Sequence, residues 1–588
     1  MKTGGYVIVV VVTLFILVAG AFIMAQPLPE AYVSEVEPLF DEVSGFGYLE
    51  ELVTNYPQRD IWHQDGKDAA IWLRKQLEGF GLEVYTQEFS QYVKDEVVTG
   101  QENVYGISRG QVYPDEYILL IAHYDIPPYV TQGAADNASS VGAALELARI
   151  FSAEEHNRSI IFLMSDSEEY GAMTGVVRFL DEFEEIDNVV AAIALDFMNM
   201  GEMRAISQRS MGLQQGYTPL WLRELTLRAI EQEGPASNSK GLFEWIDRSV
   251  AIAPTEAGVI LKAGIPATNL GTSPVDRKTQ NLYFHTREDT IDKLRVDVMG
   301  YYGRSIERTM RAIDELPVIP SESMFYFKFG DGYLPNWSVA LLQLLFFAPL
   351  GYALVSTYRG LKGAGKLNAA AVKAEFMRWG AFFAAAVIGF IILKILPYTD
   401  LMYRYELYPA TQKDPVLYNP QYLPVLIILA VMVVTFLLFR RFTAKHRVSA
   451  VGDWDSRKLA VLILLMLLAL VAWVGKGGFA AVVFLFLPAY LWPLMASARG
   501  WGCRIINLVV VLMSNIVFFL FIFMFSSMYD IGVMWWYLLM SSSYGQFSVQ
   551  GVLTVAAGLC LYLSTIGIAW SSLETSSGGK SMQEGAKQ

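Results

Sequence analysis

Metal-binding side chains follow three short apolar stretches of the chain. "EYILLIA" runs into His123 and Asp125, "SIIFLMS" is followed by Glu168 and Glu169, and "VVAAIAL" is followed by Asp196. The apolar stretches are short and bounded by polar residues, which is typical of strands covered on both faces. Ligand sites in open α/β sheets form beyond the carboxyl ends of the strands. We therefore expect these side chains to share one cleft.

Two further segments offer the same chemistry. "GAADNAS" supplies Asp136 at a turn before a helix, and "YFHTREDT" supplies His285. Imidazole and carboxylate together suit zinc, and one carboxylate can bridge two ions. Bridged metals can lower the pKa of a shared water and polarise a carbonyl, as peptide hydrolysis requires. Each residue alone is more often an ordinary polar side chain, so the joint occurrence in order is what favours a metal site.

The elements that position these residues indicate an α/β fold with a mixed central sheet flanked by helices. Extended stretches are expected at "LEVYTQEF" and at the three apolar runs above. "GKDAAIWLRKQLEGFG" has helical spacing, which places Ala70, Trp72, Leu73 and Leu77 on one side, and it stops at glycines. His63, His156 and His446 have no comparable acidic context. We interpret them as structural.

Composition and charge divide the 588-residue chain into two parts. Hydrophobic residues make up 53% and charged residues only 18%, a balance unlike that of an ordinary soluble enzyme. Residues 26–335 carry 49 acidic and 25 basic side chains, whereas the remainder carries 9 and 20. An acidic segment of this kind argues against nucleic acid as a partner. The two cysteines, Cys503 and Cys560, both lie in the apolar part, so the acidic part has no disulfide framework.

Long apolar runs predict eight membrane spans and a multi-pass α-helical transmembrane domain. The first is an uncleaved anchor at 6–25, longer than the apolar region of a signal peptide. The others are expected near 338–357, 379–397, 422–439, 459–475, 478–497, 505–527 and 547–570. A ninth element at 531–540 is short and suits an interfacial or re-entrant position.

The distribution of basic residues predicts the orientation in the bilayer. With the N-terminus inside, 16 of the 20 basic residues outside 26–335 fall in inner segments. We therefore expect four parts: an anchor at 1–25, an extracytoplasmic or luminal domain at 26–335, a polytopic domain of about seven helices at 336–571, and a polar cytoplasmic tail at 572–588. Both termini are then cytoplasmic.

Five motifs in sequence resemble those of a known family. "AHYD", "GAADNAS", "EEYGAMTG", "LDFMN" and "HTREDT" are similar to the successive motifs of the co-catalytic zinc aminopeptidase family. This family includes bacterial leucyl aminopeptidases, glutamate carboxypeptidase, glutaminyl cyclase and transferrin receptor. The similarity covers about 34–315 and implies the zinc exopeptidase fold, two Zn²⁺ ions and a peptide substrate.

The resemblance also implies a role for each site residue. His123 and Asp196 would bind one zinc ion, Glu169 and His285 the other, and Asp136 would bridge the two. The family further implies that Glu168 is the general base, that Asp125 orients His123, and that the peptide bond between Asp136 and Asn137 is cis. Many relatives carry Ser-Asp-His before "GIPA", where this chain has Thr255, Glu256 and Ala257. This difference concerns recognition of the substrate end.

A looser resemblance rests on architecture. A protease domain joined to one leading helix and a multi-helix second half is similar to the endoplasmic reticulum metallopeptidase and the fungal vacuolar membrane protease. The leading hypothesis is therefore a membrane-anchored di-zinc aminopeptidase that contacts the lipid bilayer and acts on peptides outside the cytoplasm.

Several alternatives stay open at this point. The same fold could serve a carboxypeptidase or a glutaminyl cyclase, although the "DNAS" run favours two metals and hydrolysis. A binding protein that has lost the chemistry would normally have lost ligands, and all are present here. Finally, the helices could transport a solute and the external domain could gate them.

Overall fold

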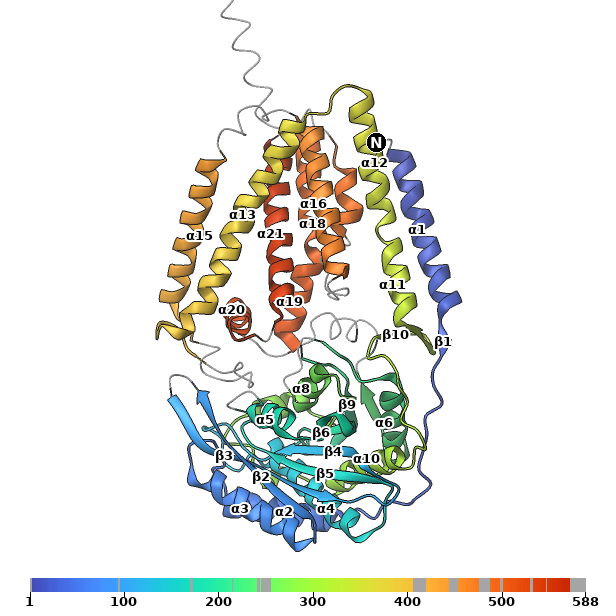
Figure 1. The fold of residues 1–588 in the computed structure, drawn as a ribbon, viewed down its shortest axis with the longest axis vertical. Helices are drawn as coiled ribbons and strands as arrows, with labels where there is room; N and C mark the ends of the chain where they lie inside the picture. Colours follow the sequence, from blue (N-terminus) through green and yellow to red (C-terminus); the bar gives the residue numbers. More distant parts are fainter. Residues whose placement is uncertain are drawn as a thin grey trace, which may run out of the picture.

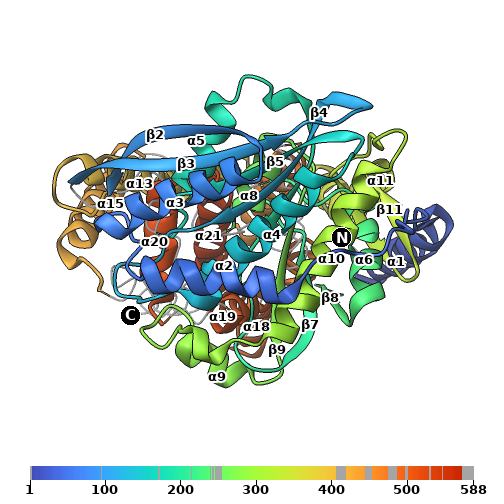
Figure 2. The same cartoon turned by 90° about the horizontal axis from the view of Figure 1, so that it is seen from below.

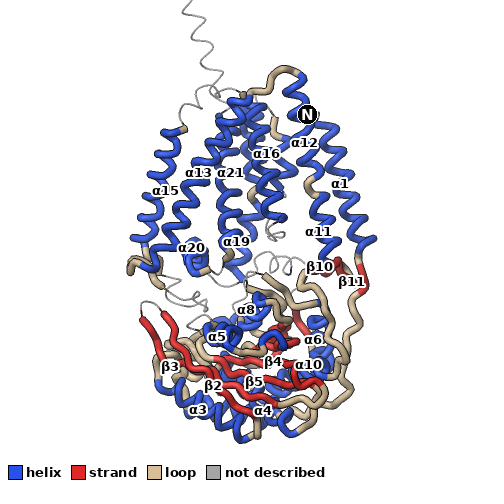
Figure 3. Tube along the Cα trace, viewed as in Figure 1, coloured by secondary structure: helices blue, strands red, loops and turns tan. Residues whose placement is uncertain are grey.

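The computed structural model describes residues 3–571, apart from 94–95, 170–172, 214, 239, 241–243, 245–254, 405–418, 444–452, 475–486, 497–500, 529–531 and 546. Within these residues the chain forms a mixed α/β domain beneath a bundle of long helices (Figure 1). The large sheet belongs to the α/β domain, whereas the bundle is helical (Figure 3).

The α/β domain is built on an eight-stranded sheet in the order β2-β3-β5-β4-β6-β9-β7-β8. Its strands are β2 (Glu83–Val93), β3 (Glu96–Ser108), β4 (Tyr113–His123), β5 (Arg158–Ser165), β6 (Val189–Leu195), β7 (Met203–Arg209), β8 (Ala236–Asn238) and β9 (Ala267–Pro274). The central strands β5, β4, β6 and β9 are parallel. β3 pairs antiparallel with β2 and β5, whereas β7 pairs antiparallel with β9 and parallel with β8. The predicted mixed sheet and its four extended stretches are confirmed.

Helices cover both faces of this sheet. The helices of this domain are α2 (Glu42–Asn55), α3 (Gln64–Gly79), α4 (Ser139–Ala153), α5 (Thr174–Glu182), α6 (Leu220–Glu233), α8 (Glu256–Ala263), α9 (Arg277–Tyr283) and α10 (Val296–Asp314). One apolar core joins the sheet to α2, α3, α4, α6 and α10, and a second joins it to α5 and α8. From below, α2, α3 and α4 lie across the sheet (Figure 2). The helix predicted at 66–81 is α3, and Ala70, Trp72, Leu73 and Leu77 are buried as expected.

The bundle contains the long apolar helices. They are α1 (Thr3–Met24), α11 (Asn336–Leu345), α12 (Ala348–Gly363), α13 (Ala369–Ile395), α15 (Tyr422–Phe442), α16 (Trp454–Val474), α18 (Trp501–Ser514), α19 (Ile516–Met528) and α21 (Val549–Ser571). Among the described residues, seven helical segments are long and apolar enough to cross a membrane, with α11 and α12 forming one of them and α18 and α19 another. They correspond to seven of the eight predicted spans. Half of the remaining predicted span, 478–497, lies outside the described residues, at 478–486 and 497.

Two elements connect the bundle to the α/β domain. A three-stranded sheet of β1 (Gln26–Pro27), β11 (Gly332–Pro335) and β10 (Tyr326–Phe329) ties the segment that enters the domain to the segment that leaves it. The short helix α20 (Met534–Tyr544) lies across the long helices at the end facing the domain (Figure 1). It includes most of the aromatic stretch predicted at 531–540, and it is too short to cross a bilayer.

Candidate metal centre

The parallel strands bring three predicted site segments to one edge of the sheet. His123 is the last residue of β4 and pairs with Ser165, the last residue of β5, while Ala122 pairs with Leu195 at the end of β6. The strands therefore end side by side, and the residues that follow them meet there. This is the arrangement expected from the continuous apolar runs.

Two sets of side chains at this edge share one carboxylate. His123, Asp136 and Asp196 each offer a ligand atom within 4.8 Å of the others, and so do Asp136, Glu169 and His285. Asp136 Oδ1 lies 3.4 Å from His123 Nε2, and its Oδ2 lies 2.9 Å from His285 Nε2. Asp136 thus stands between two imidazoles with one oxygen toward each.

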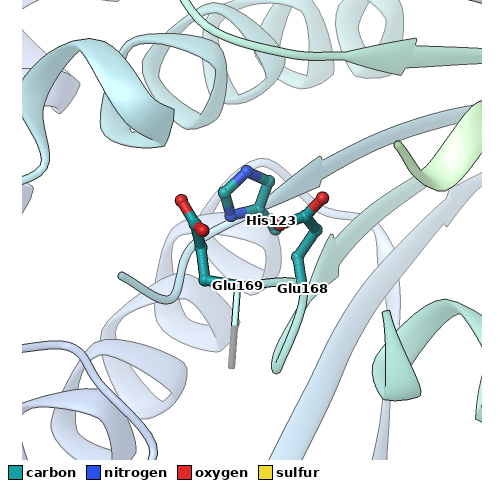
Figure 4. A group of neighbouring side chains, drawn as sticks. All are labelled: His123, Glu168 and Glu169. Atoms are coloured by element: carbon teal, nitrogen blue, oxygen red, sulfur yellow. The ribbon is translucent and has the colours of Figure 1, made fainter. Parts of the chain in front are cut away.

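Glu168 and Glu169 lie on either side of the first imidazole (Figure 4). His123, Glu168 and Glu169 form a third set with ligand atoms within 4.8 Å of one another. Glu169 Oε1 also lies 2.9 Å from His285 Nε2. The structure therefore brings all five predicted ligands and Glu168 together.

The segment that carries Asp136 is held by hydrogen bonds around an unusual backbone. The peptide bond between Asp136 and Asn137 is cis, as the resemblance implied. Asp289 accepts hydrogen bonds from the amides of Ala135 (2.7 Å) and Asp136 (3.1 Å). The Asn137 side chain donates to the carbonyl of Leu195 at 2.8 Å. Asp289, a residue of the "HTREDT" motif without an assigned role, thus positions the proposed bridge.

Asp125 contacts both the first histidine and the Glu168 segment. Its Oδ1 lies 3.5 Å from His123 Nδ1, whereas its backbone carbonyl lies 3.3 Å from that nitrogen. Its two carboxylate oxygens accept hydrogen bonds from the amides of Glu168 and Glu169, at 2.9 and 3.0 Å. The carboxylate therefore holds the backbone of the two glutamates, a contact that sequence reasoning did not include.

Burial and mutual charge set the protonation of this cluster. Burial disfavours a charged imidazole, but Glu169 and Asp136 outweigh it and raise the pKa of His285 to about 10. The pKa of His123 is raised well above its usual value, because Glu168 and its other acidic neighbours outweigh burial. Burial raises the pKa of Glu169 to about 7 and that of Glu168 well above its ordinary value. In the protein without metal, protons on the imidazoles supply the positive charge among these carboxylates.

Two charged residues near the site were not predicted as part of it. Arg209, at the end of β7, donates a hydrogen bond to Asp196 Oδ2 at 3.1 Å, and its side chain is 53% exposed against 24% for Asp196. Glu256, in the first turn of α8, is 3% exposed and accepts a hydrogen bond from Ser165. Burial raises the pKa of Glu256 to about 7. Sequence reasoning noted Glu256 only as a departure from the family, and Arg209 follows a strand that lacks a continuous apolar run.

The other histidines lie outside these sets. His156 contacts Ser108 Oγ at 2.7 Å and the Arg158 carbonyl at 2.5 Å, and His63 contacts Asp60 at 2.5 Å. These contacts fit the structural roles predicted for them. The prediction for His446 lies outside the described residues.

The fold and the side chains together define an α/β domain with a candidate two-metal centre at the carboxyl ends of its parallel strands. Residues 103–310 match the family model described as Peptidase family M28. This match, over 208 of the 588 residues, confirms the predicted resemblance.

Curated relatives match over part of the chain only. A "Probable zinc metalloprotease" of Pyricularia oryzae is 30% identical over 177 residues, which are 26% of this chain and 34% of the relative. "Aminopeptidase YwaD" of Bacillus subtilis is 31% identical over 107 residues, 18% of this chain and 23% of the relative. "BOS complex subunit ncln" of Danio rerio is 36% identical over 109 residues, 18% of this chain and 19% of the relative. The chain thus spans about a third or less of the length of these relatives.

Solved structures also align with about half of the chain. A glutaminyl cyclase of Bacteroides thetaiotaomicron aligns at 19% identity and a TM-score of 0.39, covering 48% of this chain and 100% of that structure. BSAP, a zinc aminopeptidase from Bacillus subtilis, aligns at 14% identity and a TM-score of 0.39 with the same coverage.

Proposed function

We propose that the chain is a membrane-anchored di-zinc peptidase that removes residues from the amino ends of peptides. The observation that carries the proposal is the position of Asp136, whose two oxygens face the two imidazoles of two overlapping ligand sets. A carboxylate shared in this way is the usual bridge between co-catalytic metals. The relative named as a probable zinc metalloprotease supports this choice of metal.

The donor set fits two zinc ions. Each would take one imidazole, the shared Asp136 and one further carboxylate, Asp196 on one side and Glu169 on the other, a combination that zinc prefers. The two imidazoles carry raised pKa values among the carboxylates, which indicates a place for cationic charge. When bound, the ions would lower the pKa of a shared water and polarise the scissile carbonyl.

Glu168 is the proposed general base. It lies beside His123 and Glu169 but belongs to neither of the two sets that share Asp136. Its carboxylate would accept a proton from the attacking water and donate it to the leaving amine nitrogen. The hydrogen bond from its amide to Asp125 fixes its backbone for this transfer.

Electrostatics favour the amino end of a peptide. Two bound zinc ions would offset the charge of the ligand carboxylates, which leaves Glu168 and buried Glu256 as acidic groups beside the metals. An ammonium group at the substrate's amino end would be attracted to these two groups, whereas a terminal carboxylate would be repelled by them. A carboxypeptidase is the second candidate, and the observation that favours it is the half-exposed guanidinium of Arg209 beside Asp196.

A matched pair of peptides tests the proposal. The purified full-length chain is assayed with one peptide that has a free amino end and an amidated carboxyl end, and with the same peptide acetylated at its amino end and free at the other. Zinc per chain is measured in parallel.

Two zinc ions per chain and cleavage of the first peptide only are expected. Cleavage of the second peptide only, with activity lost in Arg209→Met, would instead establish the carboxypeptidase. One zinc ion with pyroglutamate formation would establish the cyclase.

The proposed placement of the α/β domain outside the cytoplasm rests on the basic residues of the bundle. Arg359, Lys362, Arg440 and Arg441 lie near the ends of α12 and α15 that point away from the α/β domain (Figure 1). Cytoplasmic ends of membrane helices carry such an excess. In sealed vesicles of known orientation, a protease added from the extracytoplasmic side should cleave the domain and spare a tag at the C-terminus.

A further inference from the structure

The α/β domain and the bundle share a continuous apolar cluster. Ile61, Val93 and Val98 come from the domain, and all three are buried. The bundle supplies Leu393, Leu396, Met402, Ile428, Trp536 and Met540 to the same cluster. The β2–β3 hairpin reaches up to the lower ends of α13 and α15 at this place (Figure 1). Because these side chains would otherwise face water, the contact stabilises a fixed arrangement of the two parts.

An arginine of the bundle strengthens the contact at the hairpin. The guanidinium of Arg404, just beyond Met402, lies 4.0 Å from the ring centroid of Tyr92 and 4.7 Å from that of Tyr398. A planar cation between two aromatic rings is favourable and orients both of them. Tyr92 belongs to β2, so Arg404 fixes the outer end of this strand relative to the bundle.

The residue next to Tyr92 contacts the segment of the proposed general base. Gln91 is 1% exposed, and its Nε2 donates a hydrogen bond to Ser167 Oγ at 2.8 Å. Ser167 is fully buried and has a φ of 62°, a left-handed conformation that non-glycine residues seldom adopt. It immediately precedes Glu168. A strained residue of this kind depends on its surroundings to hold its conformation.

A second set of contacts leads from the same cluster to the Asp136 segment. Ile61 is part of the cluster, and Arg59, two residues earlier, is completely buried. Arg59 donates hydrogen bonds to the carbonyls of Tyr124 (2.8 Å) and Gln132 (2.7 Å). Those carbonyls belong to the segment between His123 and Asp136. The cluster therefore adjoins the supports of both catalytic segments.

We propose that the bundle positions Glu168 through Arg404, Tyr92, Gln91 and Ser167. These are positioning residues, since none of them belongs to the ligand sets. The proposal rests on the proposed function, and it gives the bundle a role beyond anchoring. A lipid or partner that shifts the end of α13 would change the turnover rate by moving Ser167, without any contact to the substrate.

Variants of the full-length chain test this coupling. Gln91→Leu removes the hydrogen bond to Ser167, and Arg404→Met removes the cation from the two rings. Each should lower kcat about tenfold to a hundredfold, because a small displacement of a catalytic group has that effect, while zinc content and KM stay within twofold. The double variant should be about as slow as the slower single variant, since both changes act through Ser167.

The matched control is Lys328→Met. Lys328 belongs to β10, which is also close to the bundle, and its Nζ lies 3.0 Å from Glu224 Oε1 on α6. This pair leads to neither catalytic segment, so Lys328→Met should leave kcat unchanged. Equal losses in all three single variants, or additive losses in the double variant, would overturn the proposal.

Hydrogen exchange separates this proposal from the proposed function. The backbone amides of Glu168 and Glu169 donate hydrogen bonds to the Asp125 carboxylate. Their protection against hydrogen exchange therefore reports the position of this segment without any substrate. Both amides should exchange faster in Gln91→Leu and Arg404→Met than in the parent chain or in Lys328→Met. Unchanged amide protection in both variants would refute the coupling, whether or not the parent chain cleaves peptides. A parent chain that is inactive toward every peptide would refute the proposed function alone.

Discussion

The carboxylate of Asp125 accepts a hydrogen bond from the backbone amide of Glu168 at 2.9 Å. Its other oxygen binds the next amide, that of Glu169, so the carboxylate is occupied on both sides. The distance from Asp125 Oδ1 to His123 Nδ1 is 3.5 Å, which is long for a hydrogen bond. Asp125 thus acts on the two glutamates at least as directly as on the imidazole that the family resemblance assigned to it.

Asp125→Asn should separate these two roles. Asparagine has one carbonyl oxygen in place of two acceptors, and its NH₂ group would face one of the two amides as a second donor. We expect activity to fall about 10- to 100-fold, the usual effect of losing a partner of a metal ligand, with faster exchange of the Glu168 and Glu169 amides. Asp297→Asn, which changes a surface pair with Arg295, is the control. Unchanged exchange of the Glu168 and Glu169 amides in Asp125→Asn would contradict the role of Asp125 at the glutamates and leave only its role at His123.

Glu168→Gln and Glu169→Gln should differ although the residues are adjacent. Glu168 is the proposed base, so its amide variant should keep both zinc ions and lose at least ~100-fold in kcat. Glu169 is a proposed ligand beside His285, so its variant should bind about one zinc ion per chain. Metal analysis and steady-state kinetics on the same preparations check both. An unchanged rate in Glu168→Gln would refute the assignment of the base.

The central strands and the residues after them could be predicted because β4, β5 and β6 are covered on both faces and are therefore continuously apolar. Parallel pairing then places their carboxyl ends together, so His123, Glu169 and Asp196 follow from local sequence alone. The segment "LEVYTQEF" also predicts a strand, but β2 continues to Val93, because its outer end packs against the bundle. No local pattern reports such a contact between distant segments.

Arg209 and Glu256 illustrate the same limit within the site. Arg209 ends a strand that mixes buried and exposed residues, and it meets Asp196 only through the pairing of β7 with β9 and of β9 with β6. Glu256 reaches Ser165 from a helix 91 positions later. Their types are common on protein surfaces, so only the tertiary fold identifies them.

Removing zinc should make the stability of the α/β domain fall as the pH rises. Burial raises the pKa of Asp289 and of Glu256 to about 7, and acidic neighbours raise that of His285 to about 10. The folded chain therefore binds more protons than the unfolded chain between about pH 4 and pH 10, and it loses stability across that interval. Bound zinc requires deprotonated ligands and should reverse the trend.

Thermal unfolding with and without a chelator measures this effect. The chelated protein should melt at least about 3 °C lower at pH 8 than at pH 5, the scale of 1 kcal/mol in a domain of this size, and zinc should reverse the sign of this difference. Glu256→Gln deletes one of the groups and should reduce the slope. A chelated protein that is more stable at pH 8 would contradict the expected sign.

Glu375 should hold three helices of the bundle together. This carboxylate of α13 is 2% exposed, lies 3.0 Å from Arg457 on α16 and accepts a hydrogen bond from Ser564 on α21 at 2.5 Å. Glu375→Gln would remove the negative charge that faces the Arg457 guanidinium across the helix contact, a loss of about 1–3 kcal/mol. Lys373→Gln changes an exposed charge on the same helix and is the control. In detergent, the first variant should melt clearly below the parent chain and the second should melt with it. Equal melting temperatures for the two variants would mean that the pair contributes little, and that apolar packing alone holds α13 against α16 and α21.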